Sequence, residues 1–374
     1  MRKVNDTMKI LTINPGSTST KIAVFEDGQT LYSANVSHDA SELAKYASIS
    51  DQLPYRERTI RALLAENGVN LDGTAAVVGR GGGLIAMEGG VYAVDALLLD
   101  HAAKGANGVQ HPAQLGPQLA RTFSGELGCP AFVVNPPDTD ELQDVARMTG
   151  IRGVYRNVHL HALNLKETAI RHAQGMGRQY EDCNFVVCHI GGGVSVSAHR
   201  KGRMIDGCDI VGGEGPMAPT RCGAVPASAL IDYCFSGVDK KTAKALCTKT
   251  GGFVSLLGTA DAIQVSERAA GGERLAWLAW NGMIYQIVKE IGAMAAALHG
   301  QVDGILLGGG MVHNKDLVAQ ITGACSFIAP VSAYPGEFEM EAMAAGALRA
   351  LKGEEAVRQY TGVSVFQAFK ALTR

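Results

Sequence analysis

Features that would direct a protein to nucleic acid or to a membrane are missing from this sequence. Charged residues make up only 19% of the chain, the formal net charge is −2, and no block of Lys or Arg exceeds a few residues. No stretch approaches 18 uncharged apolar residues, and the first residues lack the apolar core of a signal peptide. We therefore expect a cytoplasmic protein that binds a small soluble ligand, without nucleic-acid or membrane partners.

Three frequent sequence signatures are absent as well. The eight cysteines include no C-x-x-C pair and no evenly spaced framework, so we interpret them as reduced residues of the core. There is no G-x-G-x-x-G with a following acidic partner, which disfavours a dinucleotide-binding fold. There is also no G-x-x-x-x-G-K-[ST], which disfavours a P-loop. Any phosphate-binding site must therefore use other turns.

The chain is long enough for two domains, since it has 374 residues of which 47% are hydrophobic. The order of predicted elements in the first half is strand, hairpin, strand, helix, strand. From Asn184 a similar order begins again, although the residues themselves barely repeat. The expected strands are 8–13, 21–25, 31–36, 75–78, 131–134, 184–190, 194–199, 203–206, 304–307 and 326–328, and the expected helices are 56–67, 158–172, 273–298, 314–322 and an Ala-rich helix at 337–351. Two copies of one α/β unit, about 175 residues apart, indicate a duplicated fold.

Three turns between these elements are candidates for phosphate binding. The turn Asn14–Lys21 (NPGSTSTK) offers hydroxyls, backbone N–H groups and one lysine, and such a turn can hold an anion. The turn 189–195 (HIGGGVS) has three glycines where side chains would obstruct a phosphate near the backbone. The turn 307–311 (LGGGM) follows a buried strand and precedes a helix, where α/β units bind ligands.

Six motifs, in order along nearly the whole chain, carry a resemblance to a known family. They are the turn 14–21, VGRGG at 78–82, CHIGGG at 188–193, GEGP at 213–216 with TRCG at 220–223, LGGG at 307–310, and YPGE at 334–337. With these motifs the sequence resembles the butyrate kinases of the acetate kinase family. The resemblance implies two ribonuclease-H-like domains of the actin-like ATPase fold with a nucleotide cleft between them, ATP and Mg²⁺ as cofactors, and a homodimer or larger homo-oligomer.

By position, the resemblance also implies roles for individual residues. Arg80 and Arg221 match the arginines that, in acetate kinases, hold the carboxylate and the transferring phosphoryl group. His111 and His161 fall where the family has histidines around that phosphate, and Glu339, or failing that Glu337, matches the glutamate near Mg²⁺. The residues expected to bind the nucleotide are Asn14, Ser17, Ser19, Lys21, His189, Gly191, Gly192 and Gly193 at the phosphates, with Gly308, Gly309 and Gly310 at the adenosine.

This chain departs from the acetate kinase pattern at two positions. Gly192 stands where acetate kinases have asparagine, and Asn135 stands where they have an aspartate after the strand 131–134. An amide cannot supply the negative charge that holds a divalent ion. Either Asp138 or Asp140 substitutes from the same loop, or Asn135 binds Mg²⁺ through water while Glu339 carries the charge.

Residues of these types suit the phosphorylation of a carboxylate. A carboxylate is already ionised at neutral pH, so it needs no general base to act as a nucleophile. The barrier is repulsion between anions, which arginines, imidazolium groups, backbone N–H groups and Mg²⁺ reduce. Sugar kinases usually require an aspartate as base, so Asn135 counts against a sugar substrate.

We therefore predict an α/β protein with duplicated domains at 1–178 and 179–374, whose C-terminal helices could pack back on the first domain. The predicted reaction is ATP plus butyrate, or a similar short or branched fatty acid, giving ADP and the acyl phosphate. One alternative is a kinase for acetate or propionate, because one methylene changes pocket affinity only modestly. Another is a non-catalytic, nucleotide-binding regulatory protein of the same superfamily. An actin-like filament protein has no support in the sequence.

Overall fold

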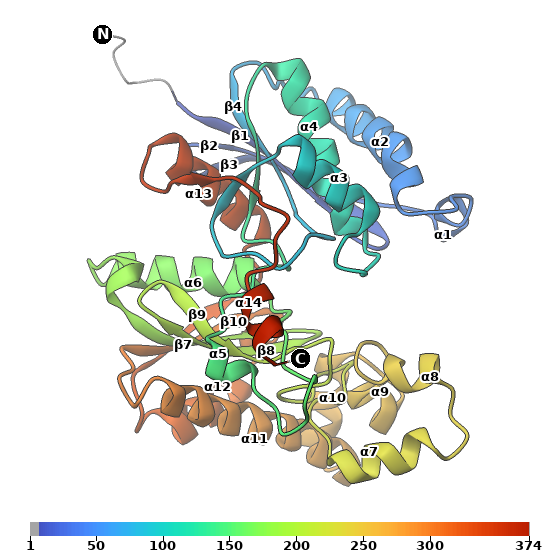
Figure 1. Ribbon diagram of the computed structural model, residues 1–374, viewed down its shortest axis with the longest axis vertical. Helices are drawn as coiled ribbons and strands as arrows, with labels where there is room; N and C mark the ends of the chain where they lie inside the picture. The colour runs from blue at the N-terminus through green and yellow to red at the C-terminus, as the bar shows by residue number, and fades with distance from the viewer. Residues whose placement is uncertain (1–6, 374) are drawn as a thin grey trace. The chain divides into compact units, whose positions relative to one another are not determined.

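The computed structural model describes residues 7–373, which fold as two compact units. One unit extends to Thr139 and also contains Phe338–Ala371, and the other contains Asp140–Glu337. Figure 1 traces the chain through both units, each built on its own sheet. No helix among the described residues is long and apolar enough to cross a membrane.

The first unit is built on a seven-stranded mixed sheet in the order β12-β5-β6-β4-β1-β2-β3. Its strands are β1 (Lys9–Pro15), β2 (Ser19–Glu26), β3 (Gln29–Ser37), β4 (Thr74–Gly79), β5 (Val91–Ala93), β6 (Ala131–Val134) and β12 (Val357–Arg358). Its helices are α1 (Ala40–Leu43), α2 (Leu53–Glu66), α3 (Ala96–Lys104), α4 (Leu115–Leu127) and α13 (Glu339–Leu351), with short 3₁₀ turns η1 (Ser50–Gln52) and η2 (Pro112–Gln114).

Helices cover both faces of this first sheet. Leu11 and Ile13 of β1 pack in one cluster with apolar residues of α2, α3 and α4. Helix α13 covers the opposite face, and Figure 1 shows it on the other side of the sheet from α2, α3 and α4. A Cβ on Gly346 of α13 would lie only 2.5 Å from Val134 Cγ1. The glycine therefore lets this Ala-rich helix approach the sheet closely, as its composition predicts.

The second unit is built on a five-stranded sheet in the order β11-β10-β7-β8-β9. Its strands are β7 (Asn184–Ile190), β8 (Val194–Arg200), β9 (Arg203–Gly207), β10 (Gly304–Gly309) and β11 (Val331–Pro335). Its helices are α5 (Asp144–Arg147), α6 (Ala162–Gly175), α7 (Ala227–Cys234), α8 (Lys240–Ala245), α9 (Gly252–Leu257), α10 (Ala262–Ala270), α11 (Arg274–Ala297) and α12 (Lys315–Cys325), with 3₁₀ turns η3 (Tyr180–Asp182) and η4 (Gly310–His313). A final helix, α14 (Gln367–Leu372), lies near the C-terminus.

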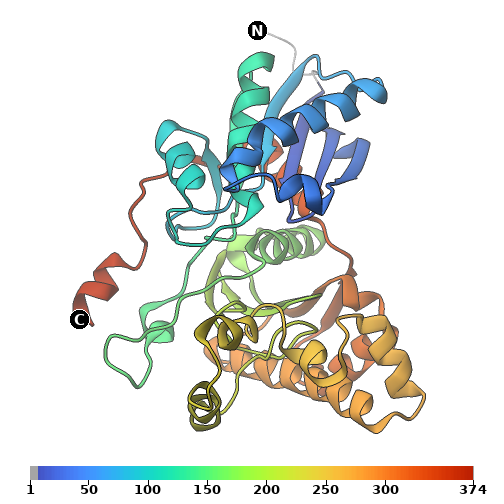
Figure 2. The ribbon, with the colours of Figure 1, turned by 90° about the vertical axis from the view of Figure 1, so that its right-hand side faces the viewer.

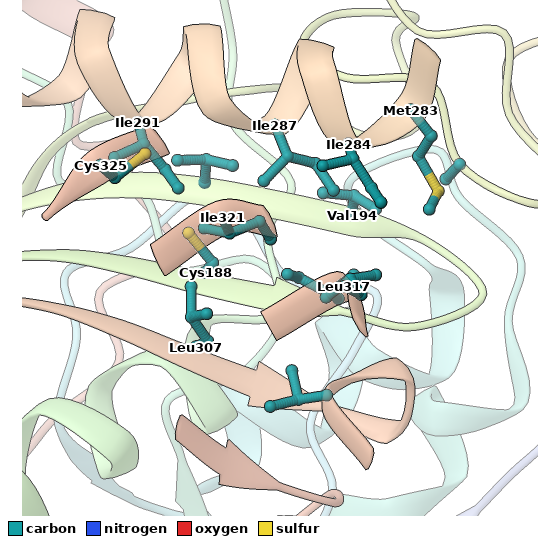
Figure 3. Close-up of a cluster of buried hydrophobic side chains, with 14 of the residues drawn as sticks. Cys188, Val194, Met283, Ile284, Ile287, Ile291, Leu307, Leu317, Ile321 and Cys325 are labelled. Atoms are coloured by element: carbon teal, nitrogen blue, oxygen red, sulfur yellow. The ribbon is translucent and has the colours of Figure 1, made fainter. Parts of the chain in front are cut away.

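Both faces of the second sheet are apolar and covered. Phe185 and Val187 of β7 pack with α6, whereas Val186 and Cys188, which alternate with them, pack with α11 and α12. Figure 2 shows α6 and α11 on opposite faces of the sheet, and Figure 3 shows Cys188 in the cluster under α11. A strand buried on both faces contains a continuous apolar run, as residues 185–188 of β7 do.

Five strands of each sheet follow the same plan, which confirms the predicted duplication and fold class. In the first unit β3, β2 and β1 pair antiparallel in sequence, and β4 and β6 extend the sheet by parallel pairing. In the second unit β9, β8 and β7 pair antiparallel, and β10 and β11 extend the sheet in parallel.

Two details differ from the sequence-based expectations. Helix α6 lies before the expected division at residue 178, yet it belongs to the second unit because its apolar face packs against β7 and β10. The predicted strand 326–328 is wrong. Helix α12 continues to Cys325, Ser326 N–H donates to Thr322 O, and the strand beside β10 begins only at Val331. The apolar residues Phe327 and Ile328 imitate a strand but lie in the turn that follows the helix.

Candidate active site

The turn between β1 and β2 forms the first part of the candidate site. The Gly16 N–H donates to Ser19 O at 2.8 Å, which closes the turn and leaves Ser17 and Thr18 exposed at its tip. β1 and β2 remain in antiparallel register up to Pro15 and Thr20. The sheet therefore holds the turn in place and leaves its hydroxyls open to a ligand.

A pocket of about 310 Å³ lies beside this turn, entirely within the first unit. It contains six of the predicted site residues, among them Lys21 of β2. Its lining residues are Asn14, Pro15, Gly16, Ser19, Lys21, Arg80, His111, Ala113, Pro137 and Glu339. Ser17 is not among them. A volume of this size can hold a small acid or part of a phosphate chain.

Arg80 is buried at the end of β4, where two glycines permit close packing. The Arg80 N–H donates to Ile13 O at 2.9 Å, and a Cβ on Gly116 of α4 would overlap the Arg80 carbonyl oxygen. Its guanidinium lies 3.9 Å from Glu339 Oε1 and donates to Asn135 O at 3.5 Å. Burial lowers the pKa of Arg80, while the carboxylates of Glu339 and Asp138 oppose that shift. These weak contacts leave Arg80 able to bind an anion.

Glu339 is the carboxylate of this pocket. The Asn14 Nδ2 donates to Glu339 Oε2 at 2.7 Å, although the two residues are 325 positions apart in the chain. Its side chain is 23% exposed, and it begins helix α13, where a negative charge suits the helix dipole. Held by Asn14 and close to Arg80, Glu339 suits charge balance or metal binding better than proton abstraction.

His111 lines the pocket in a defined orientation. It caps η2, and its Nδ1 accepts the Ala113 N–H at 3.1 Å, so the neutral ring carries its proton on Nε2. Partial burial of the ring, followed by the positive charges of Arg80 and Arg56, lowers the pKa of His111, which Glu339 partly offsets. The neutral form, which donates from Nε2, is therefore favoured.

The other predicted metal ligands are held outside the pocket. Asn135 adopts a φ of 38°, and its Oδ1 accepts the Gly90 N–H at 2.7 Å. Asp138 is buried and accepts from Asn107 Nδ2 at 2.6 Å, and Asp140 forms a buried bidentate pair with Arg147. The structure therefore brings Glu339, but not Asn135 or Asp138, into the lining of the pocket, and Asp140 belongs to the second unit.

The donor set of the pocket can accommodate Mg²⁺ only with help from a substrate. No group of three or more His, Cys, Asp or Glu side chains among residues 7–373 could hold a metal ion. Mg²⁺ usually takes one or two carboxylates and completes its shell with phosphates and water. Glu339, with its oxygens in the pocket, fits that role.

The glycine turn between β7 and β8 is the corresponding feature of the second unit. The Gly191 N–H donates to Gly193 O at 3.0 Å, and Thr220 Oγ1 donates to Gly192 O at 3.2 Å. Gly192 is exposed, and a Cβ added there would meet nothing within 4 Å. Gly193 is different, because a Cβ added there would overlap Arg221 Nη1.

Arg221 therefore packs directly against the glycine turn. Its Nε and Nη1 are buried and have no hydrogen-bond partner among the described residues. Burial lowers the pKa of Arg221, and the Asp209 carboxylate opposes the shift. Buried N–H groups of a guanidinium are rarely left without an acceptor, so this arrangement fits a site completed by an anion such as a phosphate.

Two predicted histidines meet in the same unit. The rings of His161 and His189 stack with centroids 4.0 Å apart, and His161 Nδ1 lies 2.8 Å from Ser195 Oγ. His189 Nε2 lies 3.9 Å from Glu337 Oε1, the alternative metal ligand, whose side chain is 46% exposed. Two imidazolium rings at this distance would repel each other, so the two rings are not expected to carry a positive charge at the same time.

In the third glycine turn, the packing of the sheet explains why one position is glycine. Gly309 has a φ of 99°, and a Cβ there would lie 2.5 Å from Ile190 O, so the close approach of β10 to β7 requires glycine. Gly308 is buried in β10, whereas Gly310 is exposed and has no neighbour that a Cβ would meet within 4 Å. Binding of adenosine by these glycines remains a prediction.

Three residues that contact the candidate site groups were not assigned roles from the sequence. Ser195 contacts His161, Thr220 contacts Gly192 O, and Arg56 of α2 donates to Ser19 O. Ser195 and Thr220 lie inside motifs named above, so the neighbouring motif residues could have indicated them as site residues. Arg56 lies at the start of a predicted amphipathic helix, and nothing in that pattern distinguishes it from a surface arginine.

A family model matches the segment of the chain that contains several of these site residues. Residues 147–327 match the acetokinase family model. The resemblance to the acetokinase family is thus confirmed over this segment, which contains the second glycine turn, Arg221 and the third glycine turn. The match does not specify butyrate.

Solved structures similar to this chain show the same fold. The acetate kinase of Porphyromonas gingivalis is 18% identical with a TM-score of 0.75, over 92% of this chain and 100% of that one. A propionate kinase from Francisella tularensis is 18% identical with a TM-score of 0.70, over 91% and 98%. The acetate kinase of Entamoeba histolytica is 15% identical with a TM-score of 0.72, over 91% and 99%. The chain therefore has the actin-like ATPase fold of these kinases.

Substitution of Gly193 by alanine tests the packing of Arg221 against the turn. Because the new Cβ would overlap the mobile end of Arg221, we expect the fold to be retained, the guanidinium to shift, and kcat for acyl phosphate formation to fall about 10²-fold. Steady-state kinetics and circular dichroism would measure both effects. Gly323→Ala on α12, where a Cβ meets nothing within 4 Å, is the control and should leave kcat unchanged. Full activity of Gly193→Ala would show that the position of Arg221 is unimportant.

Proposed function

We propose that this protein is a short-chain carboxylate kinase of the acetokinase family, with butyrate or a similar short or branched fatty acid as substrate. The observation that carries the proposal is Arg221, which lies inside the matched segment and whose two buried N–H groups find no hydrogen-bond acceptor in the described part of the chain. A transferring phosphoryl group is an anion that such a guanidinium can stabilise. The pocket of the first unit, with Arg80, His111 and Lys21, supplies further donors for an acid or a phosphate.

The proposed reaction is a direct, in-line transfer. A carboxylate oxygen attacks the γ-phosphorus of ATP, a new P–O bond forms, and the bond to the oxygen bridging the β- and γ-phosphates breaks. ADP leaves with that electron pair, and the acid becomes an acyl phosphate without any net proton transfer. Because the nucleophile is already ionised, the pocket needs no general base. Glu339, held by Asn14, is correspondingly not positioned as one.

The residues of this chain would then have distinct tasks. Arg80 and Arg221 neutralise charge on the carboxylate and on the equatorial oxygens of the transferring group. His111 donates from Nε2 in its neutral form, and the stacked rings of His161 and His189 offer imidazole groups at the second turn. When bound, Mg²⁺ would offset the charge of the ATP phosphates, and Glu339 is the residue that would hold it.

A hydroxamate assay for acyl phosphate tests the proposal. The purified protein would be incubated with ATP, Mg²⁺ and straight-chain acids from acetate to valerate, together with isobutyrate and isovalerate. We expect product with all short acids and the highest kcat/KM for a four-carbon or branched acid. A preference for acetate or propionate would correct the substrate. No acyl phosphate with any acid would reject the enzyme and favour a non-catalytic nucleotide-binding protein.

A further inference from the structure

Arg56 is a buried arginine that the proposed chemistry does not yet use. It lies on α2 with 0% of its surface exposed and is the largest of the fully buried side chains. Its Nε and Nη2 donate to Gln52 Oε1 at 3.1 and 3.0 Å. Its Nη1 donates to Ser19 O at 3.1 Å and to Thr20 Oγ1 at 3.0 Å. All three nitrogens of the guanidinium thus donate hydrogen bonds to fixed acceptors.

All of these acceptors are neutral. No ion pair joins Arg56 to a carboxylate among residues 7–373. A buried charge without a counterion is costly, because the protein interior solvates it less well than water does. Burial accordingly lowers the pKa of Arg56. If the side chain served only to bind three neutral acceptors, the fold would retain this cost without any benefit from the charge.

The hydrogen-bond chain that continues from Arg56 behind the turn also consists of neutral groups. Because an arginine can only donate, the Thr20 hydroxyl accepts from Arg56, and its oxygen lies 2.8 Å from His38 Nε2. His38 Nδ1 in turn lies 3.2 Å from Tyr55 Oη. Burial and the charge of Arg56 lower the pKa of His38 to about 4, so the ring is neutral.

Arg56 lies close to the pocket of the first unit. Its two acceptors on β2 are Ser19 and Thr20, at the end of the turn 16–18. Ser19 and Lys21, which flank Thr20 in the strand, both line the pocket. The charge therefore lies directly behind the pocket wall, where low polarity lets it act more strongly than an exposed charge would.

We propose that Arg56 is a positioning residue, which fixes the Ser19–Thr20 end of the turn and supplies a buried positive charge that favours binding of a phosphate anion in the pocket. This inference rests on the proposed function only in taking phosphate as the ligand. It predicts that affinity depends on the charge of residue 56 and not only on the hydrogen bonds that the side chain makes.

Binding of inorganic pyrophosphate, measured by calorimetry at low and high salt, tests the proposal without turnover. We expect Arg56→Met to weaken binding about tenfold or more and Arg56→Lys, which keeps the charge, to remain within about threefold of the natural chain. Arg58→Met removes an exposed charge from the same helix and is the matched control, expected to change the Kd by less than twofold. Melting temperatures of all variants separate binding from folding.

The titration of His38, followed by its ring proton in NMR spectra, gives a second measurement. Because a nearby positive charge lowers a histidine pKa, loss of Arg56 should raise the pKa of His38, and Arg56→Lys should largely restore it. An unchanged His38 pKa in Arg56→Met would overturn the claim that residue 56 is charged in the core. If Arg56→Met does not fold, Arg56→Lys decides, since an affinity loss of tenfold or more in a folded lysine variant contradicts a charge effect.

The remaining outcomes separate this inference from the proposed function. Lower melting temperatures for both Arg56 variants with an unchanged pyrophosphate Kd would show a purely structural role. The absence of pyrophosphate binding by the natural chain would also overturn the inference, even if acyl phosphate forms. Conversely, charge-dependent pyrophosphate binding without acyl phosphate from any acid would leave the inference in place and reject the kinase.

Discussion

Replacing Arg221 with methionine is expected to lower kcat about 10³-fold or more while the protein remains folded. The expected loss is large because the buried Nε and Nη1 of Arg221 have no hydrogen-bond partner among the described residues. Both groups can therefore form hydrogen bonds to an anion in the transition state. The same feature predicts little change in stability. Removing donors that already lack acceptors should leave the unfolding free energy within about 1 kcal/mol.

Two measurements check this expectation together. The hydroxamate assay gives kcat and KM, and urea denaturation gives the unfolding free energy. Arg274→Met, at an exposed position of α11, is the control for loss of one arginine from the same unit and should retain activity. An Arg221→Met protein with kcat within tenfold of the natural chain would exclude a role in phosphoryl transfer.

Replacing Arg80 with methionine is expected to have an effect of similar size, about 10³-fold on kcat, and also to raise KM for the carboxylate. Arg80 lines the pocket, and its guanidinium contacts protein oxygens at 3.5 and 3.9 Å, which are long enough for it to turn to a bound acid. Arg80→Lys should recover only part of the loss, because lysine lacks the planar fork that binds a carboxylate at two oxygens.

The dependence of the reaction rate on the concentration of the acid distinguishes a substrate-binding role of Arg80 from a structural role. Initial rates over a range of acid concentrations at saturating ATP would separate KM from kcat. Arg121→Met, an exposed arginine of α4 in the same unit, should match the natural chain in both constants. An Arg80→Met variant that loses stability but keeps its KM for the acid would assign the residue to folding.

Local patterns made much of the fold predictable. The strand 184–190 and the hairpins around it follow from apolar runs ended by glycine turns, and these signals lie within a few residues of each other. The error at 326–328 has the same origin, because a short apolar run does not distinguish a strand from the end of a helix. The assignment of α6 to the second unit depends on β10, more than 100 residues away, and could not be inferred locally.

Some residues of the candidate site could be predicted from the sequence, and others could not. The sequence motifs placed Arg80, His111 and the turn 14–21 on the list of candidates, and the structure brings most of them into one pocket. The metal ligands were less predictable, because the side chains of Asn135 and Asp138 bind other parts of the first unit. Residue type alone does not reveal whether an oxygen already has a partner.

The sequence by itself determined the strand and turn pattern, the duplicated α/β organisation and the residue types that suit anion chemistry, since these depend on neighbours along the chain. Only the tertiary structure decided that Asn14 holds Glu339 across 325 positions, that Gly193 makes room for Arg221, and that Arg56 is buried without a carboxylate. Such contacts form when distant segments pack, and their geometry sets which charges are paired, buried or left available to a ligand.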